Sequence, residues 1–173
     1  MSKRTPDTAV TVGELVFGEL SECKVTDGYR VTIPEDFLKV EEGIPCILAI
    51  ERVGCVSLWL EDAWRQRLEV ISTQLQGEKC ADTAQQFARL LATRQRVSAQ
   101  RGRQVALPPK FRKGIVHTEE AEKEGEKPRR FVTIVGMGFY VEIWNPESWD
   151  EYVSDTRHKF WTLFDSLAAV QRE

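Results

Sequence analysis

An internal repeat constrains the fold of this chain more than any other feature of its sequence. The segment YRVTIPEDF at 29–37 is echoed by RQVALPPKF at 103–111, and Pro34 corresponds to Pro108 at an offset of 74 positions. Self-similarity of this kind indicates that one supersecondary unit occurs twice. The sequence therefore predicts two related halves.

A second pair of matching segments lies further along each half. CILAIERVGCVSLWLEDAW at 46–64 is echoed by FVTIVGMGFYVEIWNPESW at 131–149, and Trp59 corresponds to Trp144 at an offset of 85. The offset grows by eleven because the second half carries an insertion, GIVHTEEAEKEGEKPRR, at about 114–130. The insertion is charged, contains Gly and Pro and is poor in apolar residues, so we expect a mobile surface loop.

Each half has the same predicted order of elements. Two β-type runs meet at a turn, TDG in the first half and RG in the second, and a short helix is expected to open at Pro34 and at Pro108. A hairpin follows, and then an amphipathic helix in which Trp64 and Leu68 begin an apolar stripe. A further helix over 83–92 links the two halves.

This pattern predicts an α+β fold in which two pseudo-symmetric modules share one core. A half of about 50–60 residues would be only marginally stable alone, and the chain is 42% hydrophobic, enough to fill a joint core. We expect the recurring tryptophans to pack in that core or at a subunit interface. The predicted boundaries are a disordered leader over 1–14, a first module over 15–62, connecting helices over 63–92, a second module over 93–147 and a C-terminal helix over 148–173.

Composition gives little support to several classes of protein. No apolar run approaches the roughly 20 residues of a membrane span, and the N-terminus lacks the apolar region of a signal peptide, so we expect a cytoplasmic protein without a membrane partner. The four cysteines form no CxxC pair, and Cys46 and Cys55 are expected to be buried thiols, not metal ligands. The sequence has no Gly-rich phosphate loop, and its two histidines do not suggest a nucleophile–base pair. We therefore expect neither an enzyme nor a cofactor nor a small-molecule substrate.

Charge is distributed unevenly although the net charge is only −3. Residues 83–118 contain eight Lys or Arg and no Asp or Glu, whereas residues 14–51 contain nine acids and three bases. A local basic segment of this kind is typical of a surface that binds a polyanion.

The basic segment contains the main candidates for DNA contact. Arg94 and Arg96 fall on one face of a predicted strand, and Arg101 and Arg103 flank the turn after it. Guanidinium groups suit phosphate oxygens and guanine edges, and the amide of Gln104 suits adenine. The alternative is a solvated basic face, part of which pairs with acids of the first half.

Three segments resemble the MraZ family of bacterial transcriptional regulators. They are VFGELSECKVTDGYRVTIPEDF, DTAQQFARLLATRQRVSAQ and the C-terminal run IVGMGFYVEIWNPESWDEYV, and the resemblance covers roughly Leu15 to Val153. It implies two tandem SpoVT-AbrB-like modules with swapped, interlocking hairpins in a barrel-like arrangement. It also implies a homo-oligomeric ring, binding to short repeats in promoter DNA, repression of the division and cell wall gene cluster, and a location on the nucleoid.

The first half carries part of the signature of that family. Each repeat of the family typically has Asp-x-x-x-Arg four residues before a proline, with Gly just before the Arg. Arg30 stands at the Arg position here, whereas Thr26 replaces the Asp and Tyr29 replaces the Gly. The resemblance therefore adds Arg30 to the DNA-binding candidates, although Arg30 could equally pair with Asp27, its acidic neighbour.

The second half departs further from the signature. Counting back from the matching proline places Gln104 at the Arg position and Gln100 at the Asp position. A one-residue register change would bring Arg103 into the Arg position, with Gly102 before it, provided that a bulge absorbs the change of face.

Two functional hypotheses follow. The first is a DNA-binding regulator that engages double-stranded promoter DNA with repeated sites. The second is a protein-interaction or assembly module that has kept the fold but lost sequence-specific DNA readout, with partners meeting the helix extension at 156–170 or the acidic first repeat. The departures at Thr26, Tyr29, Gln100 and Gln104 motivate the second hypothesis.

Overall fold

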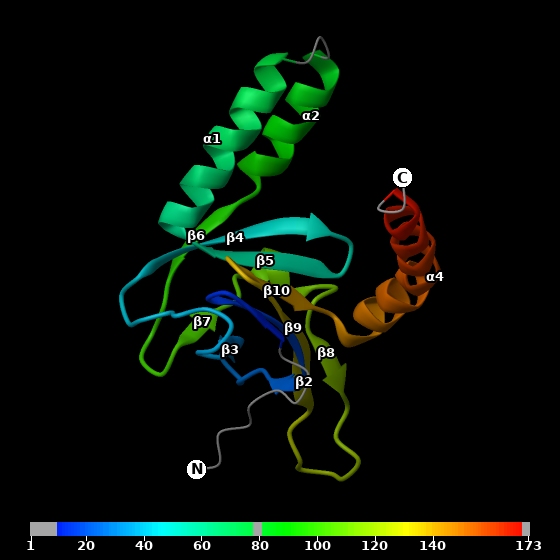
Figure 1. Cartoon of the computed structure of the whole chain (residues 1–173). Coiled ribbons are helices and arrows are strands. Elements are labelled where there is room, and N and C mark those ends of the chain that lie inside the picture. The colour runs from blue at the N-terminus through cyan, green and yellow to red at the C-terminus, as the bar shows by residue number, and fades with distance from the viewer. Residues whose placement is uncertain (1–9, 78–80, 171–173) are drawn as a thin grey trace.

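The computed structural model describes residues 10–77 and 81–170 and has the α+β fold that the sequence predicts (Figure 1). The described residues form ten strands and four helices. In chain order these elements are β1 (Val10–Val12), β2 (Leu15–Lys24), β3 (Arg30–Thr32), β4 (Pro45–Arg52), β5 (Cys55–Leu60), α1 (Glu61–Gly77), α2 (Ala81–Ala92), β6 (Gln95–Ser98), β7 (Gln104–Ala106), α3 (Pro109–Arg112), β8 (His117–Glu119), β9 (Arg129–Met137), β10 (Val141–Trp144) and α4 (Pro146–Val170).

Eight of the strands form one large antiparallel sheet. Its order is β1-β2-β9-β10-β5-β4-β6, with β8 paired to β9, while β3 and β7 pair separately as a two-stranded ribbon. Closure into a barrel would require the two edge strands to meet, but β1 and β6 are edges that do not pair with each other in the part of the chain described. The expected barrel-like arrangement is therefore wrong, and the ribbon covers the sheet in place of closure.

The two repeats exchange strands within the large sheet. β2 of the first half pairs with β9 of the second, and β6 of the second half pairs with β4 of the first. Equivalent segments meet in the two places. Cys23 lies opposite Val132, and its counterpart Val97 lies opposite Cys46, one position from the counterpart of Val132, because β2 has a register shift between Leu20 and Cys23. Each half therefore depends on the other to complete its share of the sheet.

An approximate two-fold axis relates the halves. In the ribbon, Val31 lies opposite Val105, and these residues occupy the same position in the two repeats. In the large sheet, Ser57 lies opposite Glu142, and these two residues also occupy the same position in the two repeats. Any residue on the outer face of the ribbon consequently has a counterpart nearby on the same face.

The main core lies between the large sheet and the ribbon. Val31 and Ile33 enter it from the first half and Val105 and Leu107 from the second, and all four are 0% exposed. From the sheet, the core takes Leu48, Val56, Leu58, Val132, Ile134, Val141 and Ile143. Burial of one such side chain contributes about 1.5–3 kcal/mol, so this layer holds the ribbon firmly against the sheet.

The opposite face of the sheet packs against α1, which contacts β4 and β5, and α4, which contacts β9. Trp59 of β5 meets Trp64 of α1 edge-on at 5.9 Å between ring centroids, and Trp144 of β10 meets Trp149 of α4 at 5.2 Å. The packing role expected for these four tryptophans is confirmed.

The helices extend well beyond the sheet that anchors them. In Figure 1, α1 and α2 form a hairpin that stands out from one part of the sheet, and α4 projects from another. The connecting helices expected over 63–92 thus occupy 61–77 and 81–92, and the expected C-terminal helix begins at Pro146. Within the two described ranges, no helix is long and apolar enough to cross a membrane.

Three local expectations need correction. The leader expected to be disordered over 1–14 contains β1, whose backbone pairs with β2, while residues 1–9 lie outside the described ranges. Pro34 opens a single hydrogen-bonded turn, not a helix, whereas α3 does form after Pro108. The insertion expected as a loop over 114–130 contains β8 and the start of β9, because its backbone groups pair there.

Candidate nucleic-acid interface

The outer face of the β3–β7 ribbon brings together two of the predicted DNA-binding residues. Because side chains alternate along a strand, burial of the valines at the ribbon centre turns Arg30 and Gln104 away from the core. Arg30 pairs with Ala106, and Gln104 pairs with Thr32, so Arg30 and Gln104 are counterparts on one outward face. Arg30 is exposed and Gln104 is half-buried.

Each strand of the ribbon is preceded by a tight turn of the same form. In the first half, Thr26 N donates a hydrogen bond to Arg30 O at 3.0 Å. In the second half, Gln100 N donates to Gln104 O at 2.7 Å. The ribbon is antiparallel, so these two turns lie at its opposite ends.

The register of the second signature does not change. Gln104 occupies the place of Arg30, and Arg103 occupies the place of Tyr29. Tyr29 and Arg103 also share a left-handed backbone, with φ of 56° and 59°, a conformation that explains why glycine suits this position. Arg103 therefore does not take over the role of Arg30.

Arg103 is bound to the other half of the chain. Its Nε donates a hydrogen bond to Ile33 O at 3.2 Å, and its NH1 lies 3.6 Å from Glu35 Oε2. Its side chain is 42% exposed, so one edge of the guanidinium stays accessible. Arg101, at the tip of the same turn, is exposed and has no ion-pair partner among the described residues.

A cluster of cations surrounds Tyr29 at the other end of the ribbon. The guanidinium of Arg112 lies 4.1 Å from the centroid of the Tyr29 ring, and that of Arg130 lies 4.9 Å away. Such cation–π contacts each contribute about 0.5–2 kcal/mol. The tyrosine that replaces the expected glycine thus gathers two arginines of the second half beside Arg30.

Asp27 is neutralised in the same region. Lys127 Nζ donates a hydrogen bond to Asp27 Oδ2 at 2.6 Å, and Arg130 NH1 lies 3.7 Å from Oδ1. The hydrogen bond and the charge of Lys127 hold the pKa of Asp27 below its ordinary value. Because Asp27 pairs with these residues and not with Arg30, Arg30 has no ion-pair partner among the described residues.

Arg112 belongs to the basic segment that the sequence shows, but the sequence did not indicate that Arg112, Lys127 and Arg130 would meet at one turn. Lys127 meets Asp27 and Arg130 meets Tyr29, each about one hundred positions away in the chain, and these contacts form only because the halves interlock. The basic ends of the insertion were the available signal, but nothing in the sequence indicated which turn they would meet.

Arg94 and Arg96 lie on the other side of the large sheet. Arg96 sits opposite Ile47, a residue of the cluster under α1, and its Nε lies 3.2 Å from Glu61 Oε1. Arg94 precedes β6, and its NH1 donates to Leu91 O at 3.2 Å. Both line a pocket beside α1. The structure therefore separates this pair from the ribbon face.

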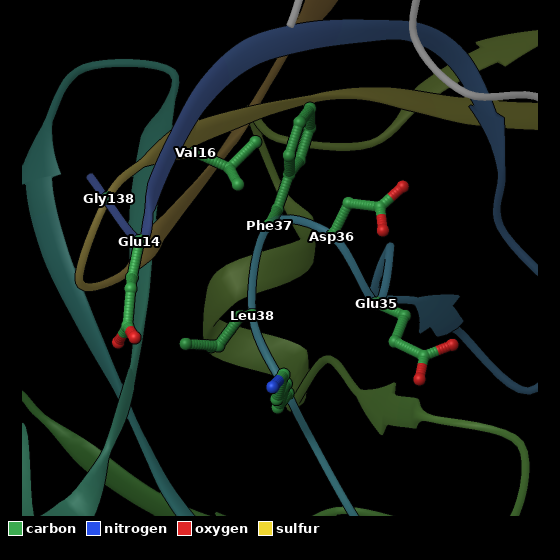
Figure 2. A pocket seen from close by; sticks show the side chains of 8 residues that line it. Glu14, Val16, Glu35, Asp36, Phe37, Leu38 and Gly138 are labelled. Atoms are coloured by element: carbon green, nitrogen blue, oxygen red, sulfur yellow. The ribbon is translucent and has the colours of Figure 1, made fainter. Parts of the chain in front are cut away.

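An acidic pocket of about 430 Å³ limits the basic surface on one side. Figure 2 shows Glu14, Glu35 and Asp36 around it, with Phe37 lining its apolar part. Carboxylates in this number repel phosphate, so this side of the ribbon is unfavourable for a polyanion.

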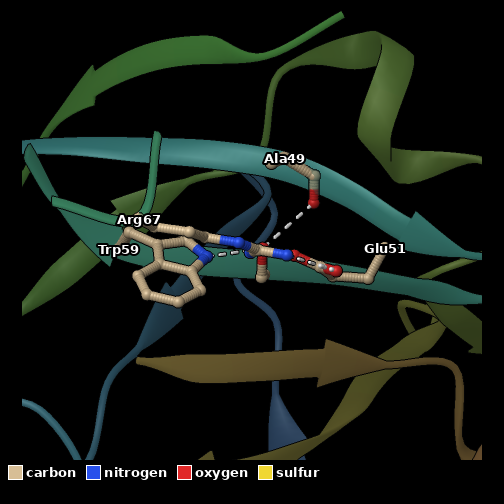
Figure 3. Close-up of polar contacts among 5 residues, drawn as sticks. Ala49, Glu51, Trp59 and Arg67 are labelled. Carbon is tan, nitrogen blue, oxygen red and sulfur yellow. Dashed lines mark hydrogen bonds and ion pairs between the residues drawn. The ribbon is translucent and has the colours of Figure 1, made fainter. Parts of the chain in front are cut away.

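The helix-covered face of the sheet carries a polar network whose members satisfy one another (Figure 3). Arg67 NH1 donates to Glu51 Oε1 at 2.7 Å, and the Arg67 guanidinium lies 4.7 Å from the centroid of the Trp59 ring. The Ser57 hydroxyl donates to Glu51 at 2.6 Å and accepts from Trp59 Nε1 at 2.8 Å. These mutual contacts indicate a structural role.

Glu142 is the counterpart of Ser57 and the least solvated acid of this face. It is 7% exposed, and burial raises the pKa of its carboxyl, although Trp144 Nε1 donates a hydrogen bond to it at 2.8 Å. Its environment favours the protonated form relative to an exposed glutamate.

The cysteines behave as small apolar residues. Cys46 and Cys55 are buried, as the sequence predicts. Burial raises the pKa of Cys23 to about 12 and that of Cys46 to about 11, which leaves both thiols protonated at neutral pH. Among residues 10–77 and 81–170, no group of three His, Cys, Asp or Glu side chains is placed to hold a metal ion.

No family model matches this chain, and no curated protein matches it either.

Proposed function

We propose that this protein is a DNA-binding transcriptional regulator of the MraZ type, built from two SpoVT-AbrB-type modules. The observation that carries the proposal is the ribbon surface, on which Arg30 and Gln104 share one outward face and Arg101 lies at the adjoining turn. A two-stranded β-element of this kind fits the major groove.

The exchange of strands between the halves supports the modular part of the proposal. A swapped-hairpin module needs strands from two repeats, and β2–β9 and β6–β4 are pairings between repeats. The matching left-handed residues before β3 and β7 add to this support, because the family places glycine there.

The residues of the surface have distinct roles in this proposal. Arg30 and Arg101 neutralise phosphates, because neither guanidinium pairs with an acid among the described residues. Gln104 reads a base edge with its amide. Arg112, Lys127 and Arg130 hold the turn at Tyr29 and add positive potential. Several copies in a homo-oligomer then bind spaced repeats of a promoter on the nucleoid, because avidity multiplies weak contacts. Binding at these repeats represses transcription from that promoter.

Fluorescence anisotropy on DNA with two spaced sites, compared with DNA carrying one site, tests this proposal. We expect tighter binding to the repeated sites and an affinity that falls with salt by about 0.9 logarithmic units per decade for each phosphate contacted. The absence of salt-dependent binding to duplex DNA would contradict the proposal.

A second candidate function is a protein-interaction module without DNA readout. It is favoured by the engagement of Arg103 with Glu35 and of Arg96 with Glu61, which leaves fewer free cations than the sequence suggests. Purification at low salt separates the two candidates. Co-purifying nucleic acid supports the regulator, and a stable protein partner with no nucleic acid absorbance supports the interaction module.

A further inference from the structure

The second half of α4 exposes an apolar surface far from the sheet. We call Phe160, Trp161, Leu163 and Phe164 the α4 ridge; their exposed fractions are 56%, 59%, 62% and 55%. The phenylalanine rings stack on each other with centroids 6.1 Å apart. Single exposed apolar residues are ordinary, but four adjacent ones on one helix mark a contact surface.

The internal repeat indicates what kind of element covers such a surface. α4 is the counterpart of α1, since Trp149 corresponds to Trp64 and Val153 to Leu68 at the same offset. In α1 the apolar stripe is met by a second helix, α2, which packs against it beyond the edge of the sheet. Among the described residues no second helix covers α4, so the position that α2 fills in the first half is open in the second.

The α1–α2 hairpin offers a matching surface. A groove of about 480 Å³ runs between its two helices and is open to solvent. The residues that line this groove are Leu68, Ile71, Ser72, Ala84, Phe87, Ala88 and Leu91. All but one are apolar, and a third helix laid along them would complete a three-helix bundle by ridge-into-groove packing.

The ridge and the groove of one copy are apart in the fold. Figure 1 shows α4 and the α1–α2 hairpin leaving the sheet at different places. One chain therefore carries an exposed apolar ridge and an apolar groove, and an adjacent chain is able to cover both.

We propose that the α4 ridge of one copy docks into the α1–α2 groove of a second copy. The contact is head-to-tail, so each copy uses its ridge for one neighbour and its groove for another. It deepens the homo-oligomer part of the proposed function and is independent of DNA binding.

The surface area buried between ridge and groove determines the strength of a single contact. An aromatic side chain buries at most about 150–250 Å², so four partly exposed ridge residues and the groove together remove on the order of 1,000 Å², near the lower limit for a specific interface. A single contact is therefore weak, and closure of several copies strengthens it through avidity.

A membrane surface fits the ridge less well. On the side of α4 away from the ridge, the helical spacing places Glu151, Asp155 and Asp165 against Lys159. Helices that lie on anionic lipid are rich in Lys and Arg on their polar side, and α4 has an excess of acids.

Sedimentation velocity on the full chain without DNA tests the docking. Phe160→Ser with Phe164→Ser removes the ridge, and Ala88→Glu places a charge in the groove. Both sites are exposed on helices and away from the core. Gln85→Glu, on the exposed side of α2 away from the groove, is the matched control. We expect concentration-dependent assembly of the wild-type chain and of the control, and at least a tenfold weaker assembly of each of the other two variants.

Mixing gives the decisive result. A ridge variant keeps its groove and a groove variant keeps its ridge, so an equimolar mixture should form a dimer and nothing larger. Rescue in the mixture also shows that both variants are folded. The docking is overturned if the wild-type chain is a monomer, if Ala88→Glu assembles normally, or if the mixture stays monomeric. Flotation of a monomeric wild-type chain with phosphatidylserine vesicles would instead assign the ridge to lipid. Assembly without DNA binding would overturn only the proposed function, and DNA binding by a monomer would overturn only the docking.

Discussion

Replacement of Gly136 by alanine should destabilise the contact between the two halves. A Cβ atom at Gly136 would lie 2.8 Å from Cδ1 of Phe37 and 3.2 Å from the carbonyl oxygen of Val16. Phe37 is 2% exposed and belongs to the main core, so its ring has little room to move. We expect Gly136→Ala to lower the free energy of unfolding by about 1–3 kcal/mol, the usual cost of overpacking. In a chain of this size each kcal/mol corresponds to a fall in Tm of about 2–4 °C.

Urea denaturation of a double-mutant cycle measures this effect. Phe37→Leu removes the ring atoms that meet the new methyl group, so the double variant should be more stable than the sum of the two single changes by about 0.5–3 kcal/mol. Gly28→Ala is the control, because its Cβ would find its nearest neighbours at 3.9 Å and its φ is not positive. The reasoning fails if Gly136→Ala is no more harmful than Gly28→Ala, or if the two costs simply add.

Two further predictions concern the helix-covered face of the sheet. Arg67→Lys keeps the charge near Glu51 but loses the planar contact with Trp59, so it should lower the free energy of unfolding by about 1 kcal/mol, measured by urea denaturation. Glu142→Gln should raise Tm near neutral pH, measured by calorimetry, because burial raises the pKa of Glu142 and its ionisation therefore costs stability as pH rises. The glutamine keeps an acceptor for Trp144 Nε1, so the gain should vanish below the ordinary glutamate pKa of about 4.3; a gain that persists there would contradict this account.

The repeat made much of the fold predictable. Matching prolines and tryptophans indicate two equivalent units, and the apolar spacing from Trp64 onward indicates a helix. The exchange of strands between the halves was less predictable, because the pairing of β2 with β9 joins residues more than one hundred positions apart. An open sheet and a barrel also require similar local patterns, and closure depends on whether the edge strands meet.

The candidate site was predictable only in part. Arg101 could be recognised because it follows a basic run and adjoins Gly102 in a turn. The separation of Arg96 from the ribbon could not be predicted, because the alternation of side chains along a strand defines two faces but does not indicate which face packs against the helices. Arg112 and Arg130 meet Tyr29 only because the two halves interlock. Arg130 also lies beside Asp27 and offsets its negative charge, which the residues next to Asp27 in the sequence do not indicate.

The central claim is that DNA binds the ribbon face and not the helix-covered face, and paired charge removals test it most directly. Arg30→Ala with Arg101→Ala removes two exposed cations from the ribbon surface, and Arg94→Ala with Arg96→Ala removes two from the opposite side of the sheet, so the change in net charge is the same. The slope of log affinity against log salt should fall by about 1.8 per engaged protomer for the first variant and stay unchanged for the second. An equal loss in both variants, or a loss only in the second, would contradict the account.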